Sequence, residues 1–191
     1  MFSDESRFLL FQNDARQRVY RRPGERYHLP CVQQIDWLGG GSTMVWGAIR
    51  FGWKSRLLVI DRTMTAQRYM DTVLQAEIVP HFQLNPHDIF MHNNARPHVA
   101  GCCQDMLRDN NITVLPWPAY SADMNPIEHL WDILGRRIRA RPAPPQTHAE
   151  LRQALIEEWN TIPQYQINRL ITSMPRRIDA LIDAQGAHTR Y

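Results

Sequence analysis

Three polar positions could together hold a divalent cation: Asp4, Asn93 and Glu128. Asp4 lies in a short apolar run that we expect to be a strand, and Asn93 directly follows another such run at residues 89–92. Glu128 comes three residues after Asn125, a residue type that favours the start of a helix. Magnesium-like ions prefer oxygen ligands, and a pair of them can activate water and stabilise the leaving oxygen of a phosphodiester. If a sheet gathers these positions, the sequence predicts metal-assisted phosphodiester chemistry.

Each of these residues also has a structural explanation when it is taken alone. Asp4 by itself is typical of a surface carboxylate, and the pair Asn93-Asn94 is typical of a turn. Glu128 has the spacing from Asn125 at which a glutamate caps a helix and interacts favourably with its dipole. The residue types alone therefore leave both explanations open.

Apolar periodicity predicts the elements that would have to gather these residues. Strands are expected at residues 2–5, 7–12, 44–51, 57–60, 89–92 and 112–115, and helices at 66–79, at 97–109 and from residue 126. Strands come first, and helices then alternate with single strands. This order predicts an α/β domain with a mixed central sheet flanked by helices.

A proline-rich stretch at residues 141–145 divides the chain into two parts. We expect residues 1–141 to form the core and residues 142–191 to form a C-terminal helical extension of the same domain, since 191 residues suffice for one buried core. Thr147 and Glu150 have the spacing of a capping box at the start of this extension. Its helical pattern continues to residue 182, with a kink expected at Pro175.

Composition excludes several classes of protein. The sequence has no apolar run of about 18 residues, so no membrane span is expected, and its N-terminus lacks the pattern of a signal peptide. Both features predict an intracellular protein. Cys31, Cys102 and Cys103 form no CxxC pair, so we expect buried apolar residues and neither a disulfide framework nor a zinc site.

A group of arginines could contact a polyanion. The net charge is +3, which permits such a partner without requiring one. The group comprises Arg136, Arg137, Arg139 and Arg141, with Arg176 and Arg177. Arginines in such a cluster contact DNA phosphates without reading the base sequence, but a solvated helix face explains the cluster equally well.

Three blocks of sequence occur in an order that resembles the mariner-type, Tc-like transposases. The blocks are SDES at residues 3–6, NNARPH at 93–98 and NPIEHLW at 125–131. Between Asn93 and Glu128 lie 34 residues, a spacing that resembles the Tc-like branch. Trp46-Gly47 and the closing residues 186–191 are also similar to that family. The resemblance covers essentially the whole chain.

The resemblance implies an RNase H-like fold with a DDE-type catalytic site. In that family an acidic triad binds two magnesium or manganese ions, which drive DNA cleavage at transposon ends and strand transfer into target DNA. Matched by position, the triad here is Asp4, Asn93 and Glu128. Arg96 and His98 would give structural or DNA-side support. The implied partners are transposon-end and target DNA and a second copy of the chain, and the implied location is the nucleus.

The sequence departs from the family pattern in two places. Where the family has aspartate, this chain has Asn93, which lacks a negative charge and has a single carbonyl oxygen. We therefore expect weak or absent nuclease activity. Relatives also carry helix-turn-helix segments before the catalytic domain, whereas this sequence opens in the first expected strand, so we expect end-specific recognition to be lost.

We do not expect a neighbouring residue to replace the missing carboxylate. Asp88 is predicted to lie at the far end of the 89–92 strand, and His92 to point to the other face of the sheet. Asp123 is the best spare carboxylate. Two alternatives to an impaired transposase remain: a non-catalytic protein that binds nucleic acid or protein through the old fold, and a gene fragment that folds poorly.

Overall fold

A computed structural model describes residues 1–10, 41–119 and 121–186 of the chain. Several features singled out in the sequence lie outside these ranges. They are Cys31, the end of the predicted 7–12 strand and most of the closing 186–191 motif.

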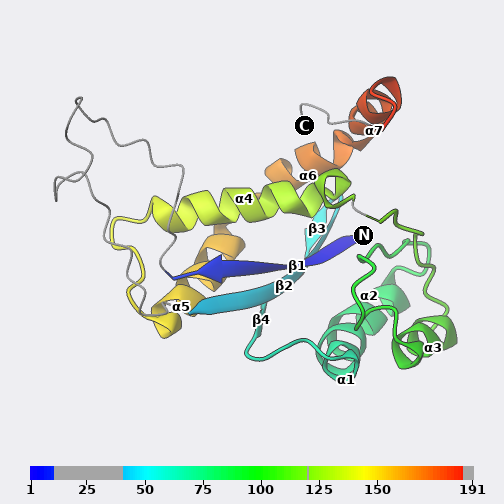
Figure 1. The fold of residues 1–191 in the computed structure, drawn as a ribbon, viewed down its shortest axis with the longest axis horizontal. Coiled ribbons are helices and arrows are strands. Elements are labelled where there is room, and N and C mark those ends of the chain that lie inside the picture. Colours follow the sequence, from blue (N-terminus) through cyan, green and yellow to red (C-terminus); the bar gives the residue numbers. More distant parts are fainter. Residues whose placement is uncertain (11–40, 120, 187–191) are drawn as a thin grey trace, which may run out of the picture.

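The sheet is built from four named strands that pair antiparallel (Figure 1). These are β1 (Phe2–Leu9), β2 (Ser42–Arg50), β3 (Trp53–Lys54) and β4 (Leu58–Ile60), and β2 pairs with the other three. The expected strands 2–5 and 7–12 form one strand over the described residues, because the ladder with β2 continues through the position between them.

The parallel part of the sheet is reduced to two single bridges. Phe2 pairs with Met91, and Phe90 pairs with Val114, both in parallel orientation. The expected strands 89–92 and 112–115 therefore exist only as short bridged segments. They still place residue 93 beside β1, and with them the sheet is mixed, as expected.

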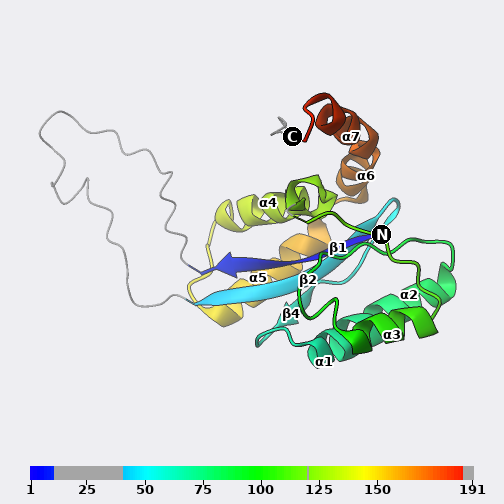
Figure 2. The ribbon, with the colours of Figure 1, turned by 45° about the vertical axis from the view of Figure 1, so that its right-hand side comes forward.

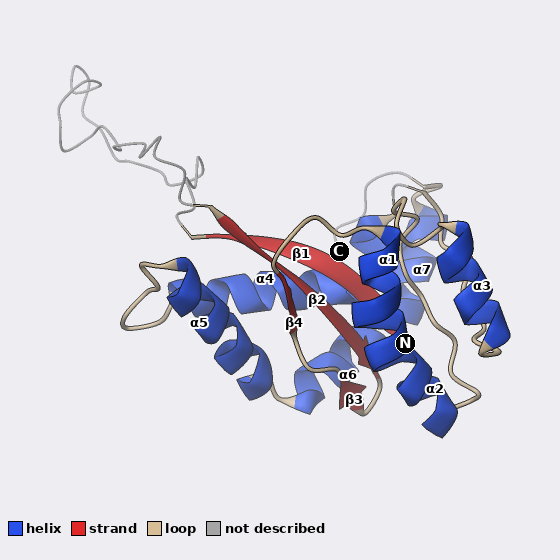
Figure 3. Cartoon of the chain, turned by 90° about the horizontal axis from the view of Figure 1, so that it is seen from below, coloured by secondary structure: helices blue, strands red, loops and turns tan. Residues whose placement is uncertain are grey.

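Helices cover both faces of the sheet (Figures 1 and 3). On one face, α4 (Pro126–Arg139) lies over β1, and α5 (His148–Thr161) and α6 (Gln164–Thr172) lie over β2. The opposite face is covered by α1 (Ala66–Tyr69), the π-helix η2 (Met70–Ile78), α2 (Val79–Leu84) and α3 (Gly101–Asp109). Two separate apolar cores result, one on each side.

The helix predicted at 66–79 extends further than expected, through α1, η2 and α2 to Leu84. Pro80 does not end it, because the change from π to α geometry places this proline in the first turn of α2, where its missing N–H is not needed. The expected cap at Thr65 is confirmed by its hydrogen bond from the Arg68 N–H.

The C-terminal extension is helical, as predicted. Thr147 caps α5 and accepts from the Glu150 N–H at 3.2 Å, while Glu150 accepts from the Gln146 N–H at 2.7 Å. The predicted kink is a break at Ser173, and Pro175 lies in the first turn of α7 (Met174–Asp183). Figure 2 shows α6 and α7 beyond the N-terminal end of α4. There α7 contacts the 3-10 turn η3 (Ala122–Met124).

The two described cysteines differ in exposure. Cys103 is buried as predicted, but Cys102 is exposed, because it lies on the outer side of α3. Within the described ranges, no helix is long and apolar enough to cross a membrane.

Candidate active site

Asp4 lies in the middle of β1, 7% exposed, and its ladder partner on β2 is Gly47. Gly47 has no side chain because two stacked indole rings occupy that space. A β-carbon there would stand 2.9 Å from the Trp131 ring and 3.0 Å from the Trp159 ring. The Trp46-Gly47 motif thus lets Trp131 of α4 approach the sheet directly beside Asp4.

Asn93 contacts Asp4 through its side chain. Its Nδ2 donates to Asp4 Oδ1 at 2.9 Å, and its Oδ1 accepts from the Ala95 N–H at 3.0 Å. These two bonds determine the orientation of the amide, because turning it over would set its NH₂ against another N–H donor. The amide therefore presents a donor to Asp4, and its only side-chain acceptor is directed at its own loop.

Glu128 lies in the first turn of α4, whose position relative to β1 is set by Asn125. Asn125 Oδ1 accepts from the Ile127 N–H, and Asn125 Nδ2 donates to the Ser3 carbonyl at 3.3 Å. The capping-box explanation of Glu128 is not met, because the Asn125 N–H donates to Ala122 O instead. The Glu128 carboxylate interacts with Asp4. The structure thus brings Asp4, Asn93 and Glu128 together.

The Glu128 carboxylate disfavours the ionisation of Asp4, whereas a hydrogen bond with Asp4 lowers the pKa of Glu128 and so opposes the effect of burial there. Burial, followed by the charges of Glu128 and Glu5, raises the pKa of Asp4 to about 7. Burial also raises the pKa of Glu128. The Trp131 indole N–H faces Asp4 and favours its charged form, although it does not reach normal hydrogen-bond geometry. Without a cation, the pair therefore retains a proton near neutral pH.

A buried histidine, His98, contacts Asn93 and Glu5 on the side of β1 opposite Asp4. The sequence indicated the histidine but not its partner Glu5. His98, which is 2% exposed, contacts Glu5 Oε1 at 3.1 Å and the Asn93 carbonyl at 3.2 Å. Its ring stacks on Tyr69 with centroids 4.0 Å apart. The structural support expected of His98 is present in these contacts. Glu5 was missed, although strand alternation places it on the opposite face from Asp4.

Known proteins resemble the chain along its whole length. A family of DDE superfamily endonucleases matches residues 1–152. The chain is also 36% identical over 198 residues to the Tcb1 transposase of Caenorhabditis briggsae and 35% identical over 198 residues to the Tc1 transposase of Caenorhabditis elegans. Both alignments cover all of this chain and 70% of the relative. The chain belongs to the DDE endonuclease superfamily and is a Tc1/mariner-type transposase catalytic domain.

Solved structures agree with the fold of this transposase domain. The catalytic domain of the Mos1 mariner transposase has a TM-score of 0.61 and 28% identity, covering 78% of this chain and 76% of that one. The Mos1 paired-end complex with manganese has a TM-score of 0.72 and 26% identity, covering 98% and 56%. The expected RNase H-like fold is confirmed.

None of the three neighbouring residues that could replace the missing carboxylate contacts Asp4 in the described part of the chain. Asp88 of the transposase domain is already paired with His81 at 2.8 Å and Arg50 at 3.4 Å. His92 turns away from Asp4, with its Nδ1 bound to the Asn93 carbonyl at 2.8 Å. Asp123 is exposed in η3. In the described part of the chain, no three histidine, cysteine, aspartate or glutamate side chains form a metal-holding group.

Three of the predicted DNA-binding arginines have carboxylate partners within the transposase domain. Arg136 pairs with Asp132 at 3.0 Å, and Arg137 lies 3.7 Å from Glu158. Arg141 bridges Glu157 and Glu158 at 2.8 and 2.9 Å. Phosphate binding by these arginines, and by Arg139, stays a prediction.

The other arginines of interest differ in exposure. The Arg177 side chain is buried and donates to Ser173 Oγ, so it is not part of an exposed basic face. Arg96 is exposed, and its DNA-side role also stays a prediction.

Proposed function

We propose that this transposase domain acts on DNA phosphodiesters at the Asp4–Asn93–Glu128 site, and that Asn93 leaves the site severely impaired. The observation that carries the proposal is the orientation of the Asn93 amide, whose N–H and not its oxygen faces Asp4. In the family an aspartate at this place would supply two acceptor oxygens and a negative charge. Asn93 supplies a donor that already occupies one oxygen of Asp4.

The residues present fit one divalent cation better than two. Asp4 and Glu128 lie together, and burial raises the pKa of both carboxyls, so a cation would stabilise their charged forms. The Asn93 N–H repels a cation placed between itself and Asp4. When bound in pairs, such ions activate water and stabilise a leaving oxygen.

The lost charge is large enough to decide the rate. Removing one negative charge about 3 Å from a divalent ion forfeits on the order of 10 kcal/mol at an effective dielectric near 20, before solvation offsets it. A residual of about 4 kcal/mol on the barrier would slow cleavage roughly a thousandfold.

Structures of Mos1 support the partners that we propose. Mos1 has been solved as a paired-end complex with a transposon end, with magnesium, with manganese and as a strand-transfer complex. By this similarity we propose that the present chain binds DNA, uses magnesium or manganese, and works as a homodimer. Because transposition acts on chromosomal DNA, we propose a nuclear location.

The decisive experiment is Asn93→Asp, assayed beside the parent for nicking of supercoiled plasmid in manganese. We expect Asn93→Asp to nick the plasmid. The parent should nick it at least a thousandfold more slowly, or not at all. Asn93→Asp combined with Glu128→Gln is the control and should be inactive. Equal activity of parent and Asn93→Asp would refute the impairment, and activity that survives the control would refute the site.

A non-catalytic DNA-binding role is the second candidate, favoured by the same Asp4–Asn93 hydrogen bond. This bond stabilises the site without any cation, so the fold does not need metal. Salt-sensitive DNA binding in EDTA that is unchanged by Glu128→Ala, together with no nicking by Asn93→Asp, would favour this role.

A further inference from the structure

Trp131 of α4 has a buried indole N–H that the mechanism proposed above does not use. The residue is 4% exposed. Within residues 1–10, 41–119 and 121–186, its N–H reaches no acceptor at normal hydrogen-bond geometry. Nearly all buried donors in folded proteins have a partner, so an unpaired N–H beside a candidate metal site calls for an explanation.

The neighbours of Trp131 hold its ring in one orientation. The ring stacks on Trp159 with centroids 5.2 Å apart and meets Phe8 edge-on at 6.3 Å. Gly47 of β2, which has no side chain, leaves room for the ring to lie against the sheet. A ring packed on these sides has little freedom to turn, and its N–H faces Asp4, the ladder partner of Gly47.

Asp4 needs a donor of this kind because its carboxylate can rotate. The terminal torsion of an aspartate is broad, so hydrogen bonds determine its orientation. In the parent, Asn93 Nδ2 holds one oxygen of Asp4 at 2.9 Å. An aspartate at position 93, as in the family, has no N–H to offer. The carboxylate would then keep the Glu5 backbone N–H and the donor that α4 provides.

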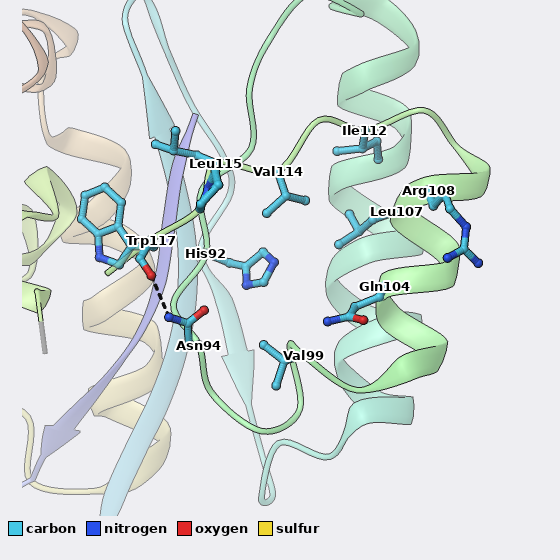
Figure 4. Close-up of a pocket in the computed structure, with 11 residues that line it drawn as sticks. His92, Asn94, Val99, Gln104, Leu107, Arg108, Ile112, Val114, Leu115 and Trp117 are labelled. Atoms are coloured by element: carbon cyan, nitrogen blue, oxygen red, sulfur yellow. Dashed lines mark hydrogen bonds between the residues drawn. The ribbon is translucent and has the colours of Figure 1, made fainter. Parts of the chain in front are cut away.

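The residues on either side of Asn93 do not hold Asp4. Figure 4 shows the His92 ring projecting toward α3, into the pocket between α3 and residues 112–117. The Asn94 side chain donates to the Trp117 carbonyl at 2.8 Å. The donor that faces Asp4 from outside this loop is therefore the indole of α4.

One helix supplies both the second carboxylate and this donor. Glu128 and Trp131 are three residues apart on α4, a spacing that places side chains on the same side of a helix. Asn125 fixes the start of the helix against β1 through its bond to the Ser3 carbonyl at 3.3 Å. The position of α4 can therefore place Glu128 and orient Asp4 at the same time.

We propose that Trp131 is a positioning residue, whose indole N–H holds the Asp4 carboxylate in the orientation that lets a cation reach both Asp4 and Glu128. The proposal rests on the proposed function, because it concerns the same site. The N–H is short of hydrogen-bond geometry in the cation-free fold, so the bond is completed when the carboxylate turns to bind a cation. Carboxylates that bind metal are generally held by such outer donors, and removal of one typically weakens metal affinity or activity by about 10–100-fold.

The test compares two stacked tryptophans that differ in the partner of their N–H. Trp131→Phe removes the N–H that faces Asp4. Trp159→Phe removes an N–H that donates to the Ser55 carbonyl at 2.8 Å. Both variants weaken the same stack, so a purely structural role predicts equal effects. With both made in Asn93→Asp, we expect Trp131→Phe to need on the order of tenfold more manganese for half-maximal nicking of supercoiled plasmid, and Trp159→Phe to need no more.

A second measurement needs neither activity nor a tryptophan variant. In isotope-labelled Asn93→Asp, magnesium should move the Trp131 indole N–H resonance to lower field, as a stronger hydrogen bond to a charged acceptor does. The Trp159 resonance should move much less, because its N–H keeps the Ser55 carbonyl. In the parent in EDTA, Asp4→Asn should move the Trp131 resonance to higher field.

The outcomes separate this proposal from the proposed function. If Asn93→Asp nicks DNA and the two tryptophan variants need the same manganese concentration, the positioning role falls alone. If Asn93→Asp neither nicks DNA nor responds to a cation, the proposed function falls, and the measurement in EDTA still decides the positioning role. A Trp131 resonance that Asp4→Asn leaves in place would overturn that role.

Discussion

Replacing Asn93 by aspartate should destabilise the cation-free protein while restoring its response to metal. In the parent, Asn93 Nδ2 donates to Asp4 Oδ1 at 2.9 Å, and Glu128 is the second carboxylate nearby. Asn93→Asp removes this donor and adds a third carboxyl group. The hydrogen bond to a charged acceptor contributes about 1.5–3 kcal/mol. Two carboxylates about 3 Å apart repel by about 5 kcal/mol at an effective dielectric near 20.

Proton uptake offsets part of this repulsion, because the carboxyl groups can share protons. We therefore expect a loss of about 2–5 kcal/mol in EDTA at pH 8, and a smaller loss near pH 5.5. For a chain of this size, about 1 kcal/mol corresponds to roughly 2–4 °C in the melting temperature. Saturating manganese, at about 100 times its dissociation constant, should return roughly 2.7 kcal/mol to Asn93→Asp. The parent should gain less stability from manganese.

Thermal melts in EDTA and in manganese measure both effects. Asn94→Asp is the matched control, since it adds the same charge one residue away but its side chain contacts the Trp117 carbonyl and not Asp4. The control should show a smaller loss and should gain no more from manganese than the parent does. The reasoning is refuted if Asn93→Asp is as stable as the parent in EDTA, or if manganese stabilises both proteins equally.

Three further predictions follow from the same contacts. The folded pKa of Asp4 is about 7, above its ordinary 3.8, so the folded state retains a proton that the unfolded state releases. The free energy of unfolding should therefore fall as pH rises between these two values and stay low above them. Urea denaturation at several pH values should show a smaller fall in Asp4→Asn than in the parent. Gly47→Ala places a methyl group 2.9 Å from a packed indole and should cost about 1–3 kcal/mol in urea, whereas Gly101→Ala, with open space around it, should not. His98→Ala loses the ring contacts with Asn93 and Glu5 and the stacking on Tyr69, so it should destabilise by about 2–4 kcal/mol, and Glu5→Gln by less. Equal losses would contradict the assigned contacts.

The family and the elements around the site follow from local features of the sequence. The Asn125 cap with Pro126 places Glu128 in the first turn of a helix, and apolar runs place Asp4 in a strand. The three sequence blocks indicate the Tc1/mariner family, which the comparisons confirm. These signals are readable because capping bonds and apolar periods act over a few residues.

Local patterns did not predict how distant side chains pair. Arg141 looked available for phosphate, but α5 brings Glu157 and Glu158 against it. The runs at 89–92 and 112–115 looked like full strands, but they make only the isolated bridges Met91 to Phe2 and Phe90 to Val114. The partners of an arginine and the length of a strand depend on which elements pack against each other. A short stretch of sequence does not determine this packing.

The sequence by itself determined that position 93 carries an amide where a carboxylate is expected. Only the tertiary structure decided which end of that amide faces Asp4, because the Ala95 N–H and a carboxylate 89 residues away together orient it. It also decided that His92 projects into the pocket beside α3 while Asn93 points toward β1. Charge is a property of the residue type, but the direction of a donor or an acceptor depends on what surrounds it.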